Sequence, residues 1–116
     1  MIYVQNIHEY EHSLRNYLAK GEYTQPFVVA GWSGIGKTAI AEKIRQEFPA
    51  LQIQDFYLEK EADEVKGQIK NACQLNVDNP RIICVTTGID MSVVREIAHF
   101  GCELYYLYLD TELWLD

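Results

Sequence analysis

Residues 31–38 read Gly31-Trp32-Ser33-Gly34-Ile35-Gly36-Lys37-Thr38, and they fit the pattern G-x-x-x-x-G-K-[ST]. An apolar run, 27–30, precedes them, and a helix-forming run, 39–45, follows them. These flanks predict a strand before the glycine-rich residues and a helix after them, which is the structural context that the pattern requires. The sequence therefore predicts a strand, a loop and a helix in direct succession.

A loop of this kind is suited to holding phosphate groups. Gly31, Gly34 and Gly36 allow backbone N–H groups to converge on an anion, and the following helix adds unpaired N–H groups and the positive end of its dipole. We expect Lys37 to reach the β- and γ-phosphates of ATP or GTP and Thr38 to bind Mg²⁺. The residues expected to contact the nucleotide are Gly31, Trp32, Ser33, Gly34, Ile35, Gly36, Lys37, Thr38 and Ala39. The simpler interpretation is a glycine-rich turn without a ligand.

Length and composition predict one globular domain. The chain has 116 residues, of which 48% are hydrophobic and 23% charged. This is enough for one modest core and shows no bias towards disorder. We expect a single domain over 1–116, with a helical extension at 1–24 and a nucleotide-binding core at 25–116. The formal net charge of −7 disfavours a nucleic-acid surface, because duplex affinity comes largely from Lys and Arg.

The cysteine pattern and the N-terminus favour a cytoplasmic protein. Cys73, Cys84 and Cys102 are scattered and form no C-x-x-C pair, which disfavours a disulfide framework or a zinc ribbon and favours reduced thiols. The first residues lack a basic start followed by a long apolar stretch, and no apolar run approaches membrane-spanning length. We expect no contact with a membrane.

Hydrophobic periodicity predicts alternating helices and strands. It favours a helix over 7–20 with Gly21 as its C-cap, ahead of the strand and helix around the loop. Further strands are expected at 51–57, 81–87 and 102–109, and further helices at 59–75 and 92–100. The alternation predicts a three-layer α/β fold with a parallel sheet of about four strands and right-handed crossovers.

The loop and the order of these elements resemble those of the P-loop NTPases, and the layout is most similar to the small-molecule kinases, shikimate kinase in particular. Besides the loop, the matching residues are Asp55 at the end of the second strand, the turn after Thr87, and the last strand with Asp110. The resemblance implies the strand order 2-3-1-4. It also implies that Asp55 binds Mg²⁺ or acts as a base, and that Gly88 lines an acceptor pocket.

The activity that this resemblance implies is slow NTP hydrolysis or phosphoryl transfer to a small acceptor, with Lys37 and Asp55 as catalytic residues. The chain departs from the family pattern, because no arginine follows Arg95 and Tyr57 replaces the second aspartate of Asp-x-Asp. A missing lid arginine removes stabilisation of the charge that spreads during phosphoryl transfer. The alternative is a truncated, non-catalytic P-loop module that acts as a nucleotide-gated or structural interaction domain. The loop is also similar to that of the NB-ARC and STAND ATPases.

Other segments allow competing interpretations. Asp90 and Asp110 each follow an expected strand and compete with Asp55 for the metal, although a carboxylate there is equally well explained as a local cap. The last strand is expected to have an open edge beside an apolar tail, 113–115, which fits a protein partner or a second copy of the chain.

A zinc site is a further alternative near the N-terminus. The segment 8–12, His-Glu-Tyr-Glu-His, fits H-E-x-x-H on a predicted helix. Catalytic zinc needs a third protein ligand, and the one other histidine, His99, lies in a distant segment. We therefore interpret these residues as a solvated helix face.

Overall fold

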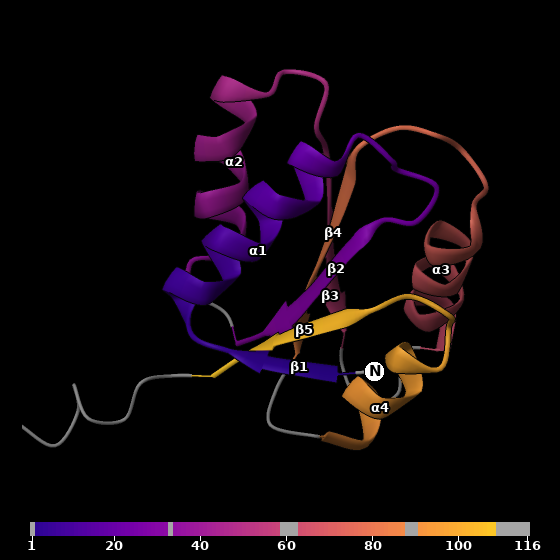
Figure 1. The fold of residues 1–116 in the computed structure, drawn as a ribbon. Helices are drawn as coiled ribbons and strands as arrows, with labels where there is room; N and C mark the ends of the chain where they lie inside the picture. Colours follow the sequence, from indigo (N-terminus) through magenta and orange to yellow (C-terminus); the bar gives the residue numbers. More distant parts are fainter. Residues whose placement is uncertain (1, 33, 59–62, 88–90, 109–116) are drawn as a thin grey trace, which may run out of the picture.

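The chain folds into a parallel β-sheet with helices on both faces (Figure 1). The computed structural model describes residues 2–32, 34–58, 63–87 and 91–108. The elements in these residues are β1 (Ile2–Gln5), α1 (Ile7–Lys20), β2 (Phe27–Gly31), α2 (Lys37–Glu47), β3 (Gln52–Leu58), α3 (Asp63–Gln74), β4 (Arg81–Thr87), α4 (Met91–Ala98) and β5 (Leu104–Leu107). The predicted α/β class with a parallel sheet is confirmed.

The sheet has five strands in the order β1-β5-β2-β4-β3, so the predicted count of four and the order 2-3-1-4 are both corrected. The added strand is β1, which pairs with β5 from Ile2 opposite Leu104 to Gln5 opposite Leu107. A four-residue strand is too short for alternation to identify it, and its partner lies at the other end of the sequence. The four strands that the sequence did predict lie in the order β3-β4-β2-β5, which is their predicted relative order, and β1 is added beyond the last of them.

The added strand also corrects the expected open edge. β5 lies between β1 and β2, so within the described residues the edges of the sheet are β1 and β3. The apolar tail at 113–115, which was expected beside that edge, lies outside the described residues. The N-terminal segment, expected as a helix ahead of the core, here also contributes a strand to the sheet.

Two apolar layers hold the helices against the sheet. On one face α1 and α2 cover residues that include Phe27, Val29 and Ile82, and on the other α3 and α4 cover residues that include Val28 and Ile83 (Figure 1). β2 is buried along its whole length and β4 is buried at all but one position, as expected of parallel strands covered on both faces.

The N-terminal helix forms where the sequence predicted it. Asn6 and Glu9 make a capping box, in which the Asn6 side chain accepts from the Glu9 N–H and the Glu9 carboxylate accepts from the Asn6 N–H. At the other end Gly21 adopts φ 75°, a left-handed conformation that costs glycine little. Tyr10 and Leu14 are fully buried in between.

Stacked rings run across three neighbouring strands beneath α1. The Tyr105 ring stacks on the Phe27 ring with centroids 4.3 Å apart, and on the Tyr3 ring with centroids 5.1 Å apart. Offset stacking of this kind adds about 0.5–1.5 kcal/mol to what area burial contributes. The aromatic residues of β5 therefore take part in joining β1 and β2 to it.

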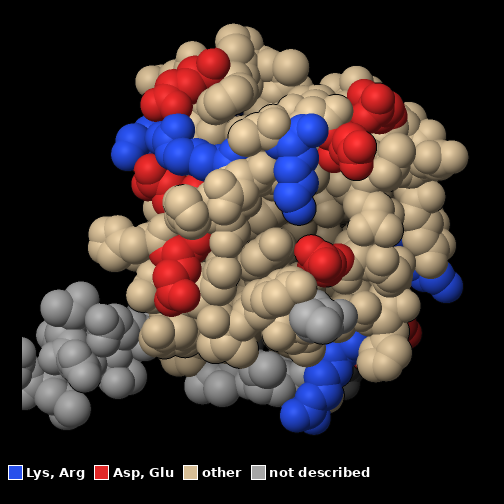
Figure 2. All heavy atoms as spheres, in the orientation of Figure 1, with Lys and Arg blue, Asp and Glu red and all other residues tan. Residues whose placement is uncertain are grey.

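Charged side chains are scattered over the surface. Figure 2 shows acidic and basic residues interspersed on the face that it draws, with no continuous basic stripe. Within the described residues, no helix is both long and apolar enough to cross a membrane.

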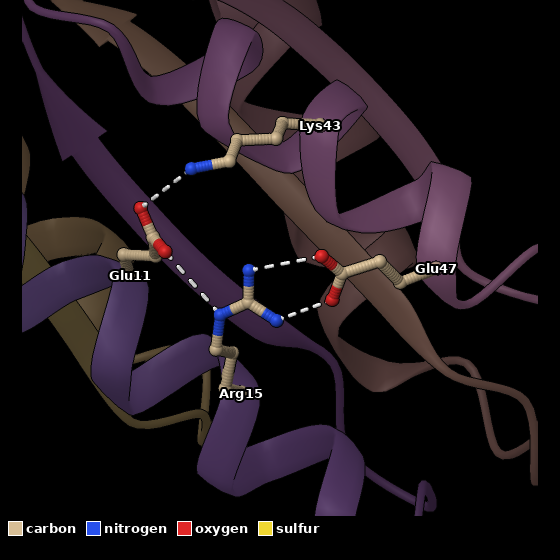
Figure 3. Close-up of polar contacts among 4 residues, drawn as sticks. All are labelled: Glu11, Arg15, Lys43 and Glu47. Atoms are coloured by element: carbon tan, nitrogen blue, oxygen red, sulfur yellow. Dashed lines mark hydrogen bonds and ion pairs between the residues drawn. The ribbon is translucent and has the colours of Figure 1, made fainter.

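An ion-pair network joins α1 to α2 (Figure 3). The Arg15 guanidinium faces the Glu47 carboxylate with both of its terminal nitrogens, and its Nε lies 3.3 Å from a Glu11 oxygen. Lys43 approaches the other Glu11 oxygen at 3.7 Å. The hydrogen bond from Arg15 lowers the pKa of Glu47. Because these side chains are partly or fully exposed, the network contributes little to stability.

Element boundaries differ from the predictions by a few residues. The predicted helix 59–75 is observed as α3 over 63–74, and 92–100 as α4 over 91–98. The predicted strand 51–57 is observed over 52–58, and the described part of the last strand covers 104–107 instead of the predicted 102–109. β5 begins where it meets both β1 and β2, which no local pattern can indicate.

We expect Tyr10→Phe to lower the free energy of unfolding by about 1 kcal/mol at neutral pH, since it removes a buried hydrogen bond to the Lys37 carbonyl. Burial raises the pKa of Tyr10 above its ordinary value of 10.0. Above that pH the unfolded wild type loses a proton that the folded state keeps, so wild-type stability falls as pH rises. The difference between wild type and Tyr10→Phe should therefore shrink with alkaline pH, as urea unfolding at several pH values would show.

Tyr57→Phe is the matched control, because the Tyr57 side chain is 65% exposed. It should change stability by less than about 0.5 kcal/mol at every pH. Equal effects of the two variants would contradict a specific role for the Tyr10 hydroxyl.

Candidate functional site

The glycine-rich loop begins at the carboxyl end of β2, the central strand of the sheet, and leads directly into α2. Gly34 and Gly36 have φ values of 81° and 106°, which residues with a Cβ rarely adopt. Gly36 is the N-cap of α2, and no side chain caps that helix end. The first N–H groups of α2, at the positive end of the helix dipole, therefore lie at the carboxyl edge of the sheet. Parallel α/β folds bind ligands at this edge.

At Gly31, the last residue of β2, the neighbouring strand β5 leaves little room for a side chain. A Cβ on this residue would lie 3.1 Å from the Leu107 carbonyl oxygen and 3.3 Å from the Leu107 Cβ. The backbone of the loop can thus start close to β5. Gly31 is not among the glycines with a positive φ. The close approach to Leu107, and not an unusual backbone conformation, is what favours glycine here.

The Lys37 side chain folds back under the loop. Its ammonium donates to the Gly31 carbonyl at 3.0 Å and to the Trp32 carbonyl at 2.6 Å, and the residue is 4% exposed. Burial lowers the pKa of Lys37, while the charges of Cys84 and Asp55 act in the opposite direction. Among the described residues, no carboxylate lies within ion-pair distance of this ammonium. A buried cation bound only by carbonyls is well placed to receive an anion.

Thr38 and Asp55 meet beside the start of α2. The Thr38 hydroxyl donates to an Asp55 carboxylate oxygen at 2.7 Å. Asp55 was expected to end its strand, but it lies in the middle of β3, opposite Cys84 of β4. The strand continues past it because β3 pairs with β4 as far as Leu58. The contact nevertheless leaves the lone pairs of the Thr38 oxygen and a second carboxylate oxygen available for a cation.

Two residues of the N-terminal segment support the loop from below, and sequence reasoning did not identify either role. The buried Tyr10 hydroxyl donates to the Lys37 backbone carbonyl at 2.7 Å. The Ile7 side chain lies 3.4 Å from where a Cβ on Gly36 would be. Helical spacing predicted that Tyr10 would be buried, yet it carries no information about the partner of its hydroxyl.

Cys84 is the third unanticipated neighbour. It is 1% exposed in β4, and burial raises the pKa of its thiol to about 12. The nearby Asp55 charge contributes to this rise, while Thr38 and the Lys37 charge oppose it. The thiol therefore stays neutral and forms part of the apolar floor beneath Thr38.

The remaining predicted residues divide between described and undescribed positions. Trp32 is 38% exposed, Ile35 is partly buried and Ala39 is exposed in the first turn of α2. The predicted site residues or competitors outside the described part of the chain are Ser33, Gly88, Asp90 and Asp110.

The two histidines of the segment 8–12 lie on the exposed side of α1. His8 and His12 are both exposed on α1, and Glu9 takes part in the helix cap. In the described part of the chain, no three His, Cys, Asp or Glu side chains form a group that could hold a metal ion.

A polar cavity of about 450 Å³ lies at the amino ends of β2 and β5, away from the loop. Its lining includes Ser13, Tyr17, Lys20 and Glu103. Ligands of parallel sheets bind beyond the carboxyl ends of the strands, so the loop is the stronger candidate site.

Comparison of this chain with protein-family models, with curated proteins and with solved structures found no match.

Gly31→Ala should destabilise the fold by about 1–3 kcal/mol, because the new Cβ forces β2 and β5 apart at Leu107. Gly67→Ala is the matched control, since Gly67 lies in α3 with nothing within 4 Å of the added Cβ. It should raise stability by about 0.5–1 kcal/mol. Thermal and urea unfolding of both variants would show whether their effects on stability have opposite signs. Destabilisation by both substitutions would contradict a specific close approach between Gly31 and Leu107.

Lys37→Met should leave the free energy of unfolding within about 1 kcal/mol of wild type. The variant loses two hydrogen bonds to carbonyls but also no longer buries an ammonium. Urea unfolding at neutral pH checks this. A loss above about 2 kcal/mol would instead indicate that Lys37 serves mainly to hold the loop together.

Proposed function

We propose that this chain is an Mg²⁺-dependent nucleoside-triphosphate-binding protein of the P-loop type, with the loop 31–38 as its phosphate site. The observation that carries the proposal is the buried Lys37 ammonium, held by two loop carbonyls at the uncapped start of α2. Polyphosphate oxygens would supply the negative charge that no described carboxylate supplies there.

The hydrogen-bond donors of the site indicate the charge of its ligand. The donors that surround it are backbone N–H groups, a helix N-terminus and one ammonium, all of which favour a compact anion. Phosphate is such an anion, and a nucleotide places several phosphates in line. Trp32 is 38% exposed next to the loop and offers a ring surface to the rest of the ligand.

The residues present fit a magnesium ion. Mg²⁺ takes oxygen ligands and keeps several waters, and it is usually held by one or two protein oxygens together with phosphates. The Thr38 hydroxyl directs its single proton to Asp55 at 2.7 Å, so its lone pairs remain for the metal. The exposed Asp55 carboxylate is placed to accept hydrogen bonds from metal-bound water. Bound Mg²⁺ would neutralise part of the phosphate charge.

The arrangement supports binding more strongly than rapid turnover. Phosphoryl transfer needs several positive groups around the transferred phosphate. The described residues contain four arginines. Arg15 and Arg45 form ion pairs with glutamates, and Arg81 is buried at the opposite end of β4. Arg95 is exposed on α4, which packs on the other face of the sheet from α2. We therefore propose that hydrolysis is slow or absent, and that the protein has a nucleotide-bound and a nucleotide-free state.

Calorimetric titration with ATP and with GTP, each with and without Mg²⁺, tests the proposal. Wild type should bind at least one nucleotide in an Mg²⁺-dependent manner, and Lys37→Met should bind it at least about tenfold more weakly. Lys43→Met is the matched control: it removes the same charge from the same helix at a 62% exposed position. It should bind like wild type.

Asp55→Asn separates the metal from the phosphates. It should weaken binding about tenfold in the presence of Mg²⁺ and leave binding without Mg²⁺ unchanged, with Asp63→Asn in α3 as its control. Phosphate release on the same samples measures turnover. Equal nucleotide binding by wild type and Lys37→Met would overturn the proposed function.

A further inference from the structure

Two buried thiols meet at the end of the molecule opposite the loop. Cys73 is the penultimate residue of α3, and Cys102 lies just before β5. Each is 5% exposed, and neither forms a disulfide. The Cys102 thiol donates to the Cys73 backbone carbonyl at 3.3 Å, so the two residues are in direct contact across 29 positions of sequence.

The contact makes the two sulfurs unequal. The interaction between the two side chains lowers the pKa of Cys102 and raises the pKa of Cys73. Cys102 is thus the thiol that ionises first, with Cys73 as its proton-bearing neighbour. A thiolate is the form of cysteine that attacks electrophiles.

A buried arginine adds positive charge to the same place. Arg81, 3% exposed, donates to the Ala72 carbonyl at 2.8 Å and to the Leu75 carbonyl at 3.0 Å, around the end of α3. Its Nε has no hydrogen-bond partner within the described residues. The Arg81 charge lowers the pKa of both thiols. The two terminal nitrogens of Arg81 cap the helix, and its buried Nε remains as a donor for a negative group.

A cavity opens onto the Cys73 side of the pair, and its lining also includes Gly101, the residue next to Cys102. It has a volume of about 370 Å³, and its lining includes Cys73, Thr24, Gln25 and Phe100. The volume is ample for a hydroperoxide, which is small, polar and able to accept and donate hydrogen bonds. Cys84, the third cysteine, lies elsewhere, beneath Thr38 in the other apolar layer.

We propose that Cys102 and Cys73 form a redox pair that a hydroperoxide converts into a disulfide, with Cys102 as the attacking thiol and Cys73 as the resolving one. The site is independent of nucleotide binding. The Cys102 thiolate attacks a peroxide oxygen: an S–O bond forms, the O–O bond breaks, and the departing oxygen takes up a proton and leaves as water or an alcohol. Cys102 becomes a sulfenic acid.

The second step joins the two sulfurs. The Cys73 sulfur attacks the Cys102 sulfur, an S–S bond forms and the S–O bond breaks, and the hydroxide leaves as water with the Cys73 proton. With hydrogen peroxide, two thiols are oxidised by two electrons in total and one peroxide is reduced to two waters. A thiol reductant reverses the reaction.

The test treats the full chain with a small excess of hydrogen peroxide and follows intact mass and thiol alkylation. We expect a loss of two hydrogens, a fall from three alkylatable thiols to one, and a linked peptide pair containing Cys73 and Cys102. Cys84→Ala is the matched control and should form the same disulfide. These readouts on wild type do not depend on the folding of any variant.

The order of attack is tested with dimedone, which reacts with sulfenic acids. Cys73→Ala should trap Cys102 as the adduct, whereas Cys102→Ala should give at least tenfold less adduct at Cys73. No loss of hydrogens, a disulfide that includes Cys84, a disulfide between chains, or preferential adduct at Cys73 would each overturn the proposal.

Discussion

The buried ammonium of Lys37 is the interaction on which the arrangement around the loop depends. Removing a cation from water costs several kcal/mol unless other groups compensate. Here two loop carbonyls accept hydrogen bonds from the ammonium and offset most of that cost, and the same bonds fix where the loop lies relative to the start of α2. The Tyr10 hydroxyl then fixes the carbonyl of the same residue from α1. The helix, the loop and the N-terminal segment therefore converge on one residue.

The position of this residue follows from the sheet. β2 lies in the centre with β5 and β4 on either side, so the loop leaves the sheet where both neighbours are already in place. Gly31 allows the loop to start within contact distance of Leu107, and β1 in turn supports β5 from its far side. A short N-terminal strand thus contributes to the site without touching it. The two apolar layers hold the helices against the two faces of the sheet.

The sequence predicted the local features of this site and missed the long-range ones. The loop and the helix after it follow from a contiguous pattern, and so does the hypothesis that Lys37 and Thr38 contact a ligand. The resemblance implied that Asp55 and Thr38 serve the same metal, and the structure has the two side chains in contact. The position of Asp55 in the middle of β3, instead of at its end, depends on how far β3 and β4 pair. β1 was missed because four residues contain too little periodicity, and its partner is distant in sequence.

The thiol pair illustrates the same limit. Scattered spacing suggested three unrelated reduced cysteines, and spacing is informative only when ligands or partners are close in sequence. The structure brings Cys73 and Cys102 together because α3 ends beside the start of β5, a relation between elements and not between neighbouring residues. The Arg81 guanidinium reaches the same point from the first residue of β4.

Electrostatics explain how the proposed binding of a polyanion at the loop is compatible with a net charge of −7. Charges separated by more than about 8 Å are largely screened at physiological ionic strength, so the acidic surface contributes little at the loop itself. Lys37 and the first N–H groups of α2 act at contact distance and in a partly water-excluded place, where their attraction is strongest. Two glutamates of the flanking helices, Glu11 and Glu47, are engaged by Arg15, and Asp55, the carboxylate that acts on Lys37, accepts a hydrogen bond from Thr38. Local donors, not the overall charge, therefore determine the sign of the field that a phosphate group meets.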